Sequence, residues 1–236
     1  MLLIHSIDIP EIYIRAIDKL FPGIIRVAVP RSEDVYASIA SHPDIFIFAL
    51  DYSTIVSSPA LYEELAAALS NTGINIIRSQ SIPSGNYPQT CPLNAARIGT
   101  YVLHNPRYTD PVIRDLVRKS GLELVRVEQG YTRCSVIPVG QNSLITCDEG
   151  IARTADGLGL DVQLVSAGNV SLPGEKYGFI GGAAGVTPDG KILFLGDIRQ
   201  HPDYAEIDRF LSDRGIGYNY LADLPLLDSG SLILLP

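Results

Sequence analysis

Short apolar segments alternate with helical segments along this chain, and their order recurs. In the clearest copy, an apolar strand at 143–147 is followed by a break at 148–150, a helical pattern at 151–158 and an apolar strand at 160–165. Apolar positions three and four apart predict the helix, and short apolar runs bounded by turn residues predict the strands. Gly159 then ends the helix, because a helix C-cap favours a residue that adopts positive φ. The pattern predicts a strand–helix–strand unit.

The same order recurs four more times. Strand, helix and returning strand are expected at 100–104, 110–119 and 122–127; at 191–195, 203–213 and 216–221; at 45–50, 59–69 and 74–78; and at 1–4, 10–20 and 24–29. In the copy at 45–78, the first strand is expected to lead through Asp51 into its helix. An ordinary α/β sheet is the alternative, because it contains strand–helix–strand order without a repeat.

Three copies carry a further apolar segment before that strand, at 92–98, 134–139 and 179–186. The last is joined to its neighbour by Thr187-Pro188-Asp189-Gly190, a strong hairpin signal. The unit is therefore strand, hairpin, strand, helix, strand. An apolar first strand at 226–235 stands alone, and residues 1–29 supply what it lacks. This pairing predicts a closed ring, because sharing a unit removes exposed sheet edges.

Composition narrows the class of protein. The chain has 236 residues, and 46% of them are hydrophobic, which suits one large α/β domain over 1–236. No apolar run approaches the roughly 18 residues of a membrane span. A net charge of −8 argues against a nucleic-acid or anionic-membrane surface. We therefore expect neither of these partners, and the oligomeric state stays open.

Three widely spaced cysteines, Cys91, Cys134 and Cys147, form no CxxC pair and are odd in number. A structural zinc site and a disulfide framework are both unexpected. Without a basic, cleavable N-terminal segment, the chain is expected in a reducing cytoplasm. No metal or organic cofactor is implied.

Several segments together resemble the pentein fold of the guanidino-group-modifying enzymes, and more closely an uncharacterised bacterial family assigned to that fold. They are GYTRCS at 130–135, ITCDEGI at 145–151, YGFIGGAAG at 177–185, FLGD at 194–197 with HPD at 201–203, and LDSGS at 227–231. The resemblance implies a five-fold pseudosymmetric α/β propeller of ββαβ units, with the last unit shared between the termini.

In the enzymes of this fold, which include arginine deiminases, dimethylarginine hydrolases and amidinotransferases, a central channel holds the guanidinium. A C-terminal cysteine attacks the guanidino carbon, a histidine handles protons, and carboxylates grip the cation. Here Ser231 stands near the place of that cysteine, and no channel histidine is recognised among His5, His42, His104 and His201. The resemblance thus implies a channel for a small, guanidino- or amidine-like ligand and leaves hydrolase or amidinotransferase activity open. A non-catalytic binding or interaction protein is the alternative, since a translation initiation factor also uses the fold.

The starts of the first strands converge on one mouth if the ring forms. The candidate ligand-binding residues there are Asn94, Arg133, Ser135, Gly181, Gly182, Asp228, Ser229 and Ser231, with Cys134 as the candidate catalytic nucleophile. Arg133 would favour the Cys134 thiolate if the two side chains touched. Adjacent strand residues point to opposite faces, however, and a free cysteine is often a small buried hydrophobe.

Asp228 lies in an otherwise apolar strand, so its carboxylate must be paired or face a cavity. A cationic ligand and an internal hydrogen-bonded turn are the two alternatives. Gly181-Gly182 lacks the GxGxxG spacing of a dinucleotide site, which favours close backbone approach at the ring centre. Asp197 and His201-Pro202-Asp203 are interpreted as a helix entry rather than an acid–imidazole pair, and Tyr131 is a candidate for the mouth.

Overall fold

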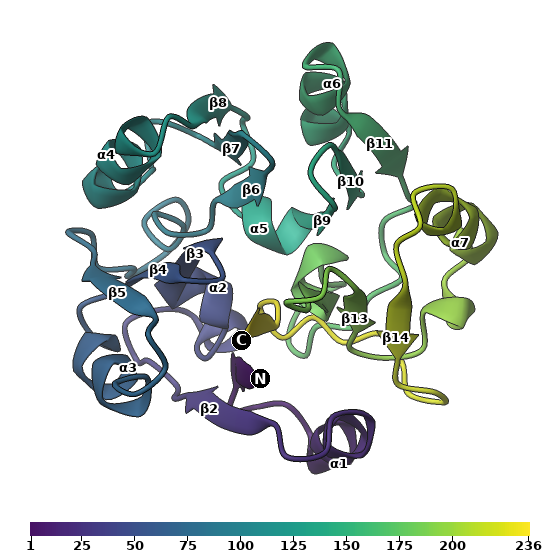
Figure 1. The fold of residues 1–236 in the computed structure, drawn as a ribbon, viewed down its shortest axis with the longest axis horizontal. Coiled ribbons are helices and arrows are strands. Elements are labelled where there is room, and N and C mark those ends of the chain that lie inside the picture. The colour runs from purple at the N-terminus through teal and green to yellow at the C-terminus, as the bar shows by residue number, and fades with distance from the viewer.

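A computed structural model describes all residues from Met1 to Pro236 and shows five three-stranded sheets arranged around a centre (Figure 1). In each sheet, the middle strand pairs antiparallel with the first strand and parallel with the third. A helix joins the second strand to the third and lies on the outside of the ring. The expected α/β propeller of ββαβ units is confirmed.

The units follow one another in chain order. The first complete unit has β3 (Ile47–Asp51), β4 (Thr54–Ser57), α3 (Tyr62–Ala68) and β5 (Asn75–Arg78); the second has β6 (Ala96–Ile98), β7 (Tyr101–His104), α4 (Pro111–Lys119) and β8 (Glu123–Arg126). The third has β9 (Val136–Val139), β10 (Ser143–Thr146), α6 (Glu149–Gly157) and β11 (Asp161–Leu164); the fourth has β12 (Ala184–Val186), β13 (Ile192–Phe194), α7 (Tyr204–Ser212) and β14 (Tyr218–Tyr220).

The fifth unit combines the two ends of the chain. It contains β15 (Ile233–Leu235), β1 (Leu2–Ser6), α1 (Glu11–Leu20) and β2 (Ile25–Val29). β15 pairs antiparallel with β1, and the two termini lie beside each other near the centre of Figure 1. The unit shared between the termini is therefore present as expected.

The expected assignment of the copy at 45–78 was wrong by one strand. Ile47–Asp51 is the first strand of its unit, and a hairpin at Asp51 leads into the second strand, Thr54–Ser57. The Asp51 carboxylate accepts hydrogen bonds from the backbone N–H and the hydroxyl of Ser53, both at 2.8 Å, which fixes this turn. Asp51 is thus a hairpin residue rather than the entry to a helix.

The core consists of five clusters of buried apolar side chains, here called wedges, and each wedge lies between two neighbouring units. Leu144 packs with residues of the second unit, whereas the adjacent Ile145 packs with residues of the fourth. Successive strand residues point to opposite faces, so a strand between two wedges is apolar at every position. A wedge also joins the fifth unit to each of its neighbours, through Leu3 and Leu193 on one side and Ile4 and Ile45 on the other. Five shared wedges close the ring.

Short helical turns precede three of the first strands at the ring centre: α2 (Pro43–Phe46) before β3, α5 (Thr132–Ser135) before β9, and the 3₁₀ turn η2 (Gly181–Ala183) before β12. Two further 3₁₀ turns, η1 (Ala37–Ile39) and η3 (Ile198–Gln200), lie in connecting segments. Asp197 accepts a hydrogen bond from the Arg199 N–H and caps η3, and Asp203 stands at the N-cap of α7 as the helix-entry interpretation expected. The Asp203 carboxylate makes no capping hydrogen bond and accepts from Ser166 instead.

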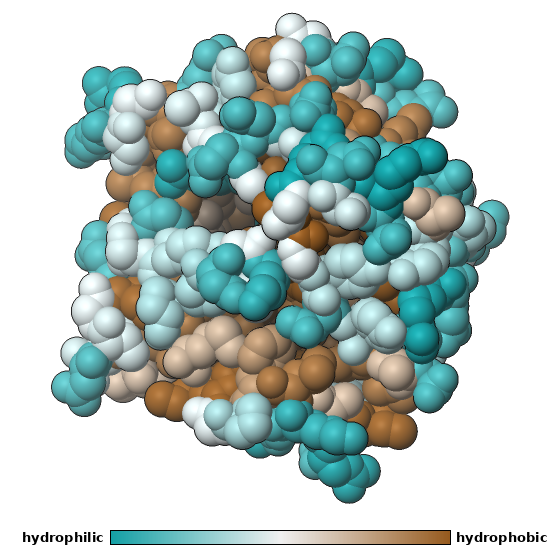
Figure 2. All heavy atoms as spheres, turned by 45° about the vertical axis from the view of Figure 1, so that its right-hand side comes forward, coloured by the Kyte–Doolittle hydropathy of each residue, from teal (hydrophilic) through white to brown (hydrophobic).

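The outer surface is mainly hydrophilic on the face of Figure 2, with hydrophobic side chains gathered toward the bottom, where α1 and β2 lie in Figure 1. Ile12, Leu20 and Ile25 of that unit are exposed. None of the helices combines the length and the apolar character needed to traverse a bilayer.

Candidate functional site

Residues that stand just before the five first strands meet at the centre of the ring. Asp44 comes from α2, Asn94 precedes β6, Cys134 lies in α5, Gly182 lies in η2, and Ser231 precedes β15. Every one of these residues is buried. Each unit of the ring therefore contributes one position to a common central cluster.

The Cys134 thiol is held by two side chains of this cluster. Its Sγ donates to Asp44 Oδ2 at 3.0 Å and accepts from Asn94 Nδ2 at 3.2 Å. The Ser231 hydroxyl donates to the same Asp44 oxygen at 2.6 Å. Cys134 is thus hydrogen-bonded to a carboxylate, which is the arrangement that a thiol nucleophile with an adjacent base requires.

His42 joins the cluster from the turn before α2. One ligating atom each of His42, Asp44 and Cys134 can be chosen so that all three lie within 4.8 Å of one another. His42 is only 4% exposed, and its Nδ1 has no hydrogen-bond partner within the protein. Burial lowers the pKa of His42, which favours the neutral imidazole. The expectation that the channel lacks a histidine was therefore wrong.

Asp228 lies beside His42, with 3.9 Å between Asp228 Oδ1 and His42 Nδ1. The Asp228 carboxylate accepts from the backbone N–H of Phe179 at 2.8 Å and of Gly230 at 3.0 Å. The internal turn expected as one alternative is present. Burial raises the pKa of Asp228 to about 6, although these hydrogen bonds and Arg133 oppose the rise. The ring centre thus holds two buried carboxylates.

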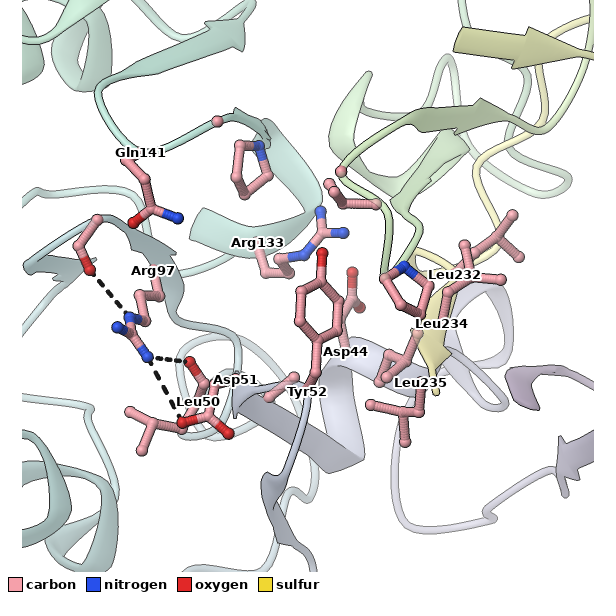
Figure 3. Close-up of a pocket in the computed structure, with 18 of the residues that line it drawn as sticks. Asp44, Leu50, Asp51, Tyr52, Arg97, Arg133, Gln141, Leu232, Leu234 and Leu235 are labelled. Atoms are coloured by element: carbon pink, nitrogen blue, oxygen red, sulfur yellow. Dashed lines mark hydrogen bonds and ion pairs between the residues drawn. The ribbon is translucent and has the colours of Figure 1, made fainter. Parts of the chain in front are cut away.

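The Arg133 side chain lines the cavity on the side of the hairpins (Figure 3). Its guanidinium donates to the carbonyl oxygens of Val136 at 2.9 Å and Gly181 at 3.2 Å. Burial, followed by the charges of Asp44 and Asp228, holds the pKa of the Cys134 thiol well above its ordinary value. Of the two alternatives for Arg133, the structure favours the one in which its side chain does not contact the thiol, and the raised pKa favours a protonated Cys134.

Cavities reach the cluster from both faces of the ring. The cavity on the hairpin side has a volume of about 540 Å³, includes Asp44 and Arg133 in its lining, and is the one drawn in Figure 3. The cavity on the opposite face has a volume of about 680 Å³ and reaches Cys134, His42 and Asp228. Four tyrosines line this second cavity: Tyr36, Tyr87, Tyr131 and Tyr177. We call it the tyrosine-lined cavity; Tyr131 lies there as the sequence indicated.

A family model described as "Family of unknown function (DUF6873)" matches residues 7–233, which is nearly the whole chain. The chain belongs to this family. No curated protein has a sequence that matches it.

Solved structures show which fold this DUF6873 protein has. It is similar to C. jejuni agmatine deiminase, with a TM-score of 0.58, 8% identity, and coverage of 93% of this chain and 87% of that one. A mutant DDAH from Pseudomonas aeruginosa complexed with citrulline gives a TM-score of 0.54 at 8% identity, with 93% and 91% covered. An amidinotransferase from Microseira wollei gives 0.52 at 8% identity, with 93% and 88% covered. All three are pentein-fold guanidino-modifying enzymes, so the DUF6873 chain has the pentein fold.

The structure brings most of the residues selected from the sequence to the centre. Asn94, Cys134 and Ser231 contact Asp44 or one another, whereas Ser229 adjoins Asp228 with a buried hydroxyl that has no partner. Ser135 is the exception: its hydroxyl donates to the Tyr131 carbonyl at 2.8 Å, within its own turn.

Sequence reasoning missed His42 and Asp44, although a signal for Asp44 exists. Once Ile47–Asp51 is taken as a first strand, Asp44 precedes it by three residues, much as Asn94 and Cys134 precede β6 and β9. His42-Pro43-Asp44 also repeats the tripeptide at 201–203. The wrong strand assignment concealed this register.

Gly182 leaves room for the Asp228 carboxylate. A Cβ at Gly182 would overlap both oxygens and the carboxyl carbon of Asp228. We expect Gly182→Ala to lower the free energy of unfolding by roughly 2–3 kcal/mol, because an added methyl group in a packed centre forces its neighbours apart. Denaturant unfolding measures this loss. In the control Gly157→Ala, the new Cβ meets nothing within 4 Å, so an equal loss in both variants would contradict the account.

The raised pKa of Asp228 predicts how stability changes with pH. A buried carboxyl with a pKa of about 6, against 3.8 for an ordinary Asp, favours the folded state most when it is protonated. Its contribution is complete below pH 4 and is lost as the pH rises through 6, a change of about 3 kcal/mol. We expect the difference in unfolding free energy between the wild type and Asp228→Asn to shift by this amount. A difference that stays constant from pH 4 to 7 would contradict a buried, protonated Asp228.

Proposed function

We propose that this protein binds a small cationic ligand of the amidine or guanidine class at the ring centre. The observation that carries the proposal is the pair of buried carboxylates, Asp44 and Asp228, neither of which has a lysine or arginine within ion-pairing distance. Asp44 Oδ1 has no hydrogen-bond partner within the protein. Arg133 acts on the two carboxylates only at longer range, and buried carboxylates without a direct ion pair favour a cationic partner. A planar amidinium presents paired N–H donors to them.

The tyrosine-lined cavity is the proposed route of entry. Its aromatic rings suit a cation, because the negative face of an aromatic ring attracts positive charge. Glu175 and Lys176 also line this cavity, so their opposite charges offset each other and the tyrosines carry this part of the argument. The similarity to an agmatine deiminase and to a citrulline-complexed DDAH supports the same class of ligand, since agmatine carries a guanidinium group.

Cys134 is the proposed nucleophile. A bound amidinium would offset the charges of Asp44 and Asp228, which are among the causes of the raised thiol pKa. The thiol proton would pass to Asp44 or His42, and the sulfur would form a bond to the amidine carbon. The carbon–nitrogen bond to the leaving amine would then break as that amine takes up a proton. Water, or a second amine, would release the product from sulfur.

Thermal unfolding with a panel of compounds tests the proposal. Agmatine, arginine and acetamidine are the cationic members, and citrulline is the neutral ureido control. A compound at about 100 times its Kd adds about 2.7 kcal/mol, which raises the Tm by roughly 5–10 °C for a chain of this size. We expect a shift with cations only. No shift with any cation, or an equal shift with citrulline, would refute the proposal.

A non-catalytic interaction protein is the second candidate, and the exposed side chains of Ile12, Leu20 and Ile25 favour it. Exposed apolar side chains that gather on one face are a common mark of protein–protein contact. Gel filtration of the wild type beside Ile25→Lys tests it. A partner-dependent or self-associated species that Ile25→Lys abolishes would support an interaction surface, and a monomer in both cases would remove self-association from consideration.

A further inference from the structure

We propose that His42, Asp44 and Cys134 form a zinc site, and that zinc bound there excludes the cationic ligand. The second half of this proposal rests on the function proposed above. The first half stands on the side chains alone. Imidazole nitrogen, carboxylate oxygen and thiolate sulfur together are the donor set of protein zinc sites.

The spacing of the three side chains fits one ion. Their ligating atoms lie within 4.8 Å of one another, and the Cys134 Sγ lies 3.0 Å from Asp44 Oδ2. Ligands of a tetrahedral zinc ion are about 3.3–3.8 Å apart, given bonds of about 2.0–2.3 Å. The cluster therefore needs to adjust by only about 1 Å.

Two buried atoms of these residues have no hydrogen-bond partner, Nδ1 of His42 and Oδ1 of Asp44. The two residues are 4% and 1% exposed. A buried polar atom without a protein partner is costly, and a bound ion would satisfy it. These two atoms belong to two of the three proposed ligand residues, so binding one metal ion would satisfy both atoms at once.

Neighbouring residues already hold the proposed ligands in place. The Ser231 hydroxyl donates to Asp44 Oδ2 at 2.6 Å and thereby leaves Oδ1 available. Asn94 Nδ2 lies 3.2 Å from the Cys134 sulfur. Hydrogen bonds of this kind orient the ligands of metal sites. Three protein ligands would leave a fourth position for water, as in zinc sites that are not purely structural.

Zinc is expected to exclude the amidinium ligand because both cations need the same protein atoms. The amidinium needs the Asp44 carboxylate, and the proposed chemistry needs the free sulfur of Cys134. Zinc would occupy both, so the two cations compete for one centre. Bound zinc would then hold the protein in an inactive form.

Titration with Co²⁺ followed by Zn²⁺, on the full-length chain after chelator treatment, tests the metal site. We expect one Co²⁺ per chain, a thiolate-to-cobalt absorption band, and its loss when Zn²⁺ displaces Co²⁺. Cys134→Ala should abolish the band, and His42→Ala should weaken binding by at least about 100-fold. The control Cys91→Ala removes a buried cysteine outside the cluster and should change neither. Thermal unfolding of each variant verifies that it folds.

Absence of stoichiometric Co²⁺ binding, or a band that persists in folded Cys134→Ala, would overturn the site. Agmatine binding, measured by calorimetry with and without one equivalent of Zn²⁺, tests exclusion. We expect zinc to abolish the agmatine signal, and an unchanged signal would overturn exclusion. If zinc binds through Cys134 and agmatine does not bind even without zinc, the proposed function fails while the metal site stands.

Discussion

Replacing Asp44 with Asn is expected to weaken agmatine binding by roughly 100-fold or more without lowering the thermal stability of the unliganded protein. Removing one partner of a buried charge pair costs 2–5 kcal/mol or more, because the bound cation loses its counter-charge. Burial raises the pKa of Asp44, which shows that the ionised carboxylate is poorly accommodated in the folded state. A neutral amide of the same shape removes that difficulty, so the Tm should stay equal or rise.

Calorimetric titration and thermal unfolding of the same samples test this prediction. Asp51→Asn is the matched control, since Asp51 is an exposed carboxylate at the hairpin side of the ring. It should bind agmatine as the wild type does. A large fall in Tm together with lost binding would assign Asp44 a structural role instead.

The second large effect concerns catalysis. For an amidine or guanidine that the protein turns over, Cys134→Ala should reduce the rate of product formation by at least about 10⁴-fold, because it removes the group that forms the proposed covalent intermediate. Binding of the same compound should change little, since the sulfur is not part of the charge pair. Release of ammonia or amine, measured in a coupled assay, reports the rate.

Cys91→Ala serves as the comparison for Cys134→Ala. Cys91 is also buried, and burial raises the pKa of its thiol to about 12, but its Sγ donates to the Pro88 carbonyl and not to the central cluster. It should retain full activity. Equal activity in the wild type and Cys134→Ala would show that Cys134 is not the nucleophile, and activity in none of the proteins would favour the non-catalytic candidate.

Much of the fold could be predicted because each signal was local. Glycines after helices, the Pro188-Asp189-Gly190 turn and the unpaired apolar strand at the C-terminus fixed the unit and its closure. Apolar residues at consecutive strand positions, such as Leu144 and Ile145, also agree with strands that are buried on both faces. These patterns depend on a few neighbouring residues, so they can be recognised in a single sequence.

The centre was only partly predictable, because its geometry depends on residues far apart in the chain. Asp44 and Cys134 are 90 positions apart and meet only after the ring closes. Thr54–Ser57 is a short, partly polar strand, and overlooking it moved Asp44 out of register with Asn94 and Cys134. The direction of the Arg133 side chain was also beyond the sequence, because α5 is a helical turn rather than a strand.

A crystal structure of Cys134→Ala with agmatine tests the central claim most directly. The account predicts a guanidinium at the ring centre, with its N–H groups within about 3 Å of the carboxylate oxygens of Asp44 and Asp228. The carbon should lie within about 3.5 Å of the position of the missing sulfur. Agmatine bound only in the hairpin-side cavity, or at neither carboxylate at saturating concentration, would contradict the account.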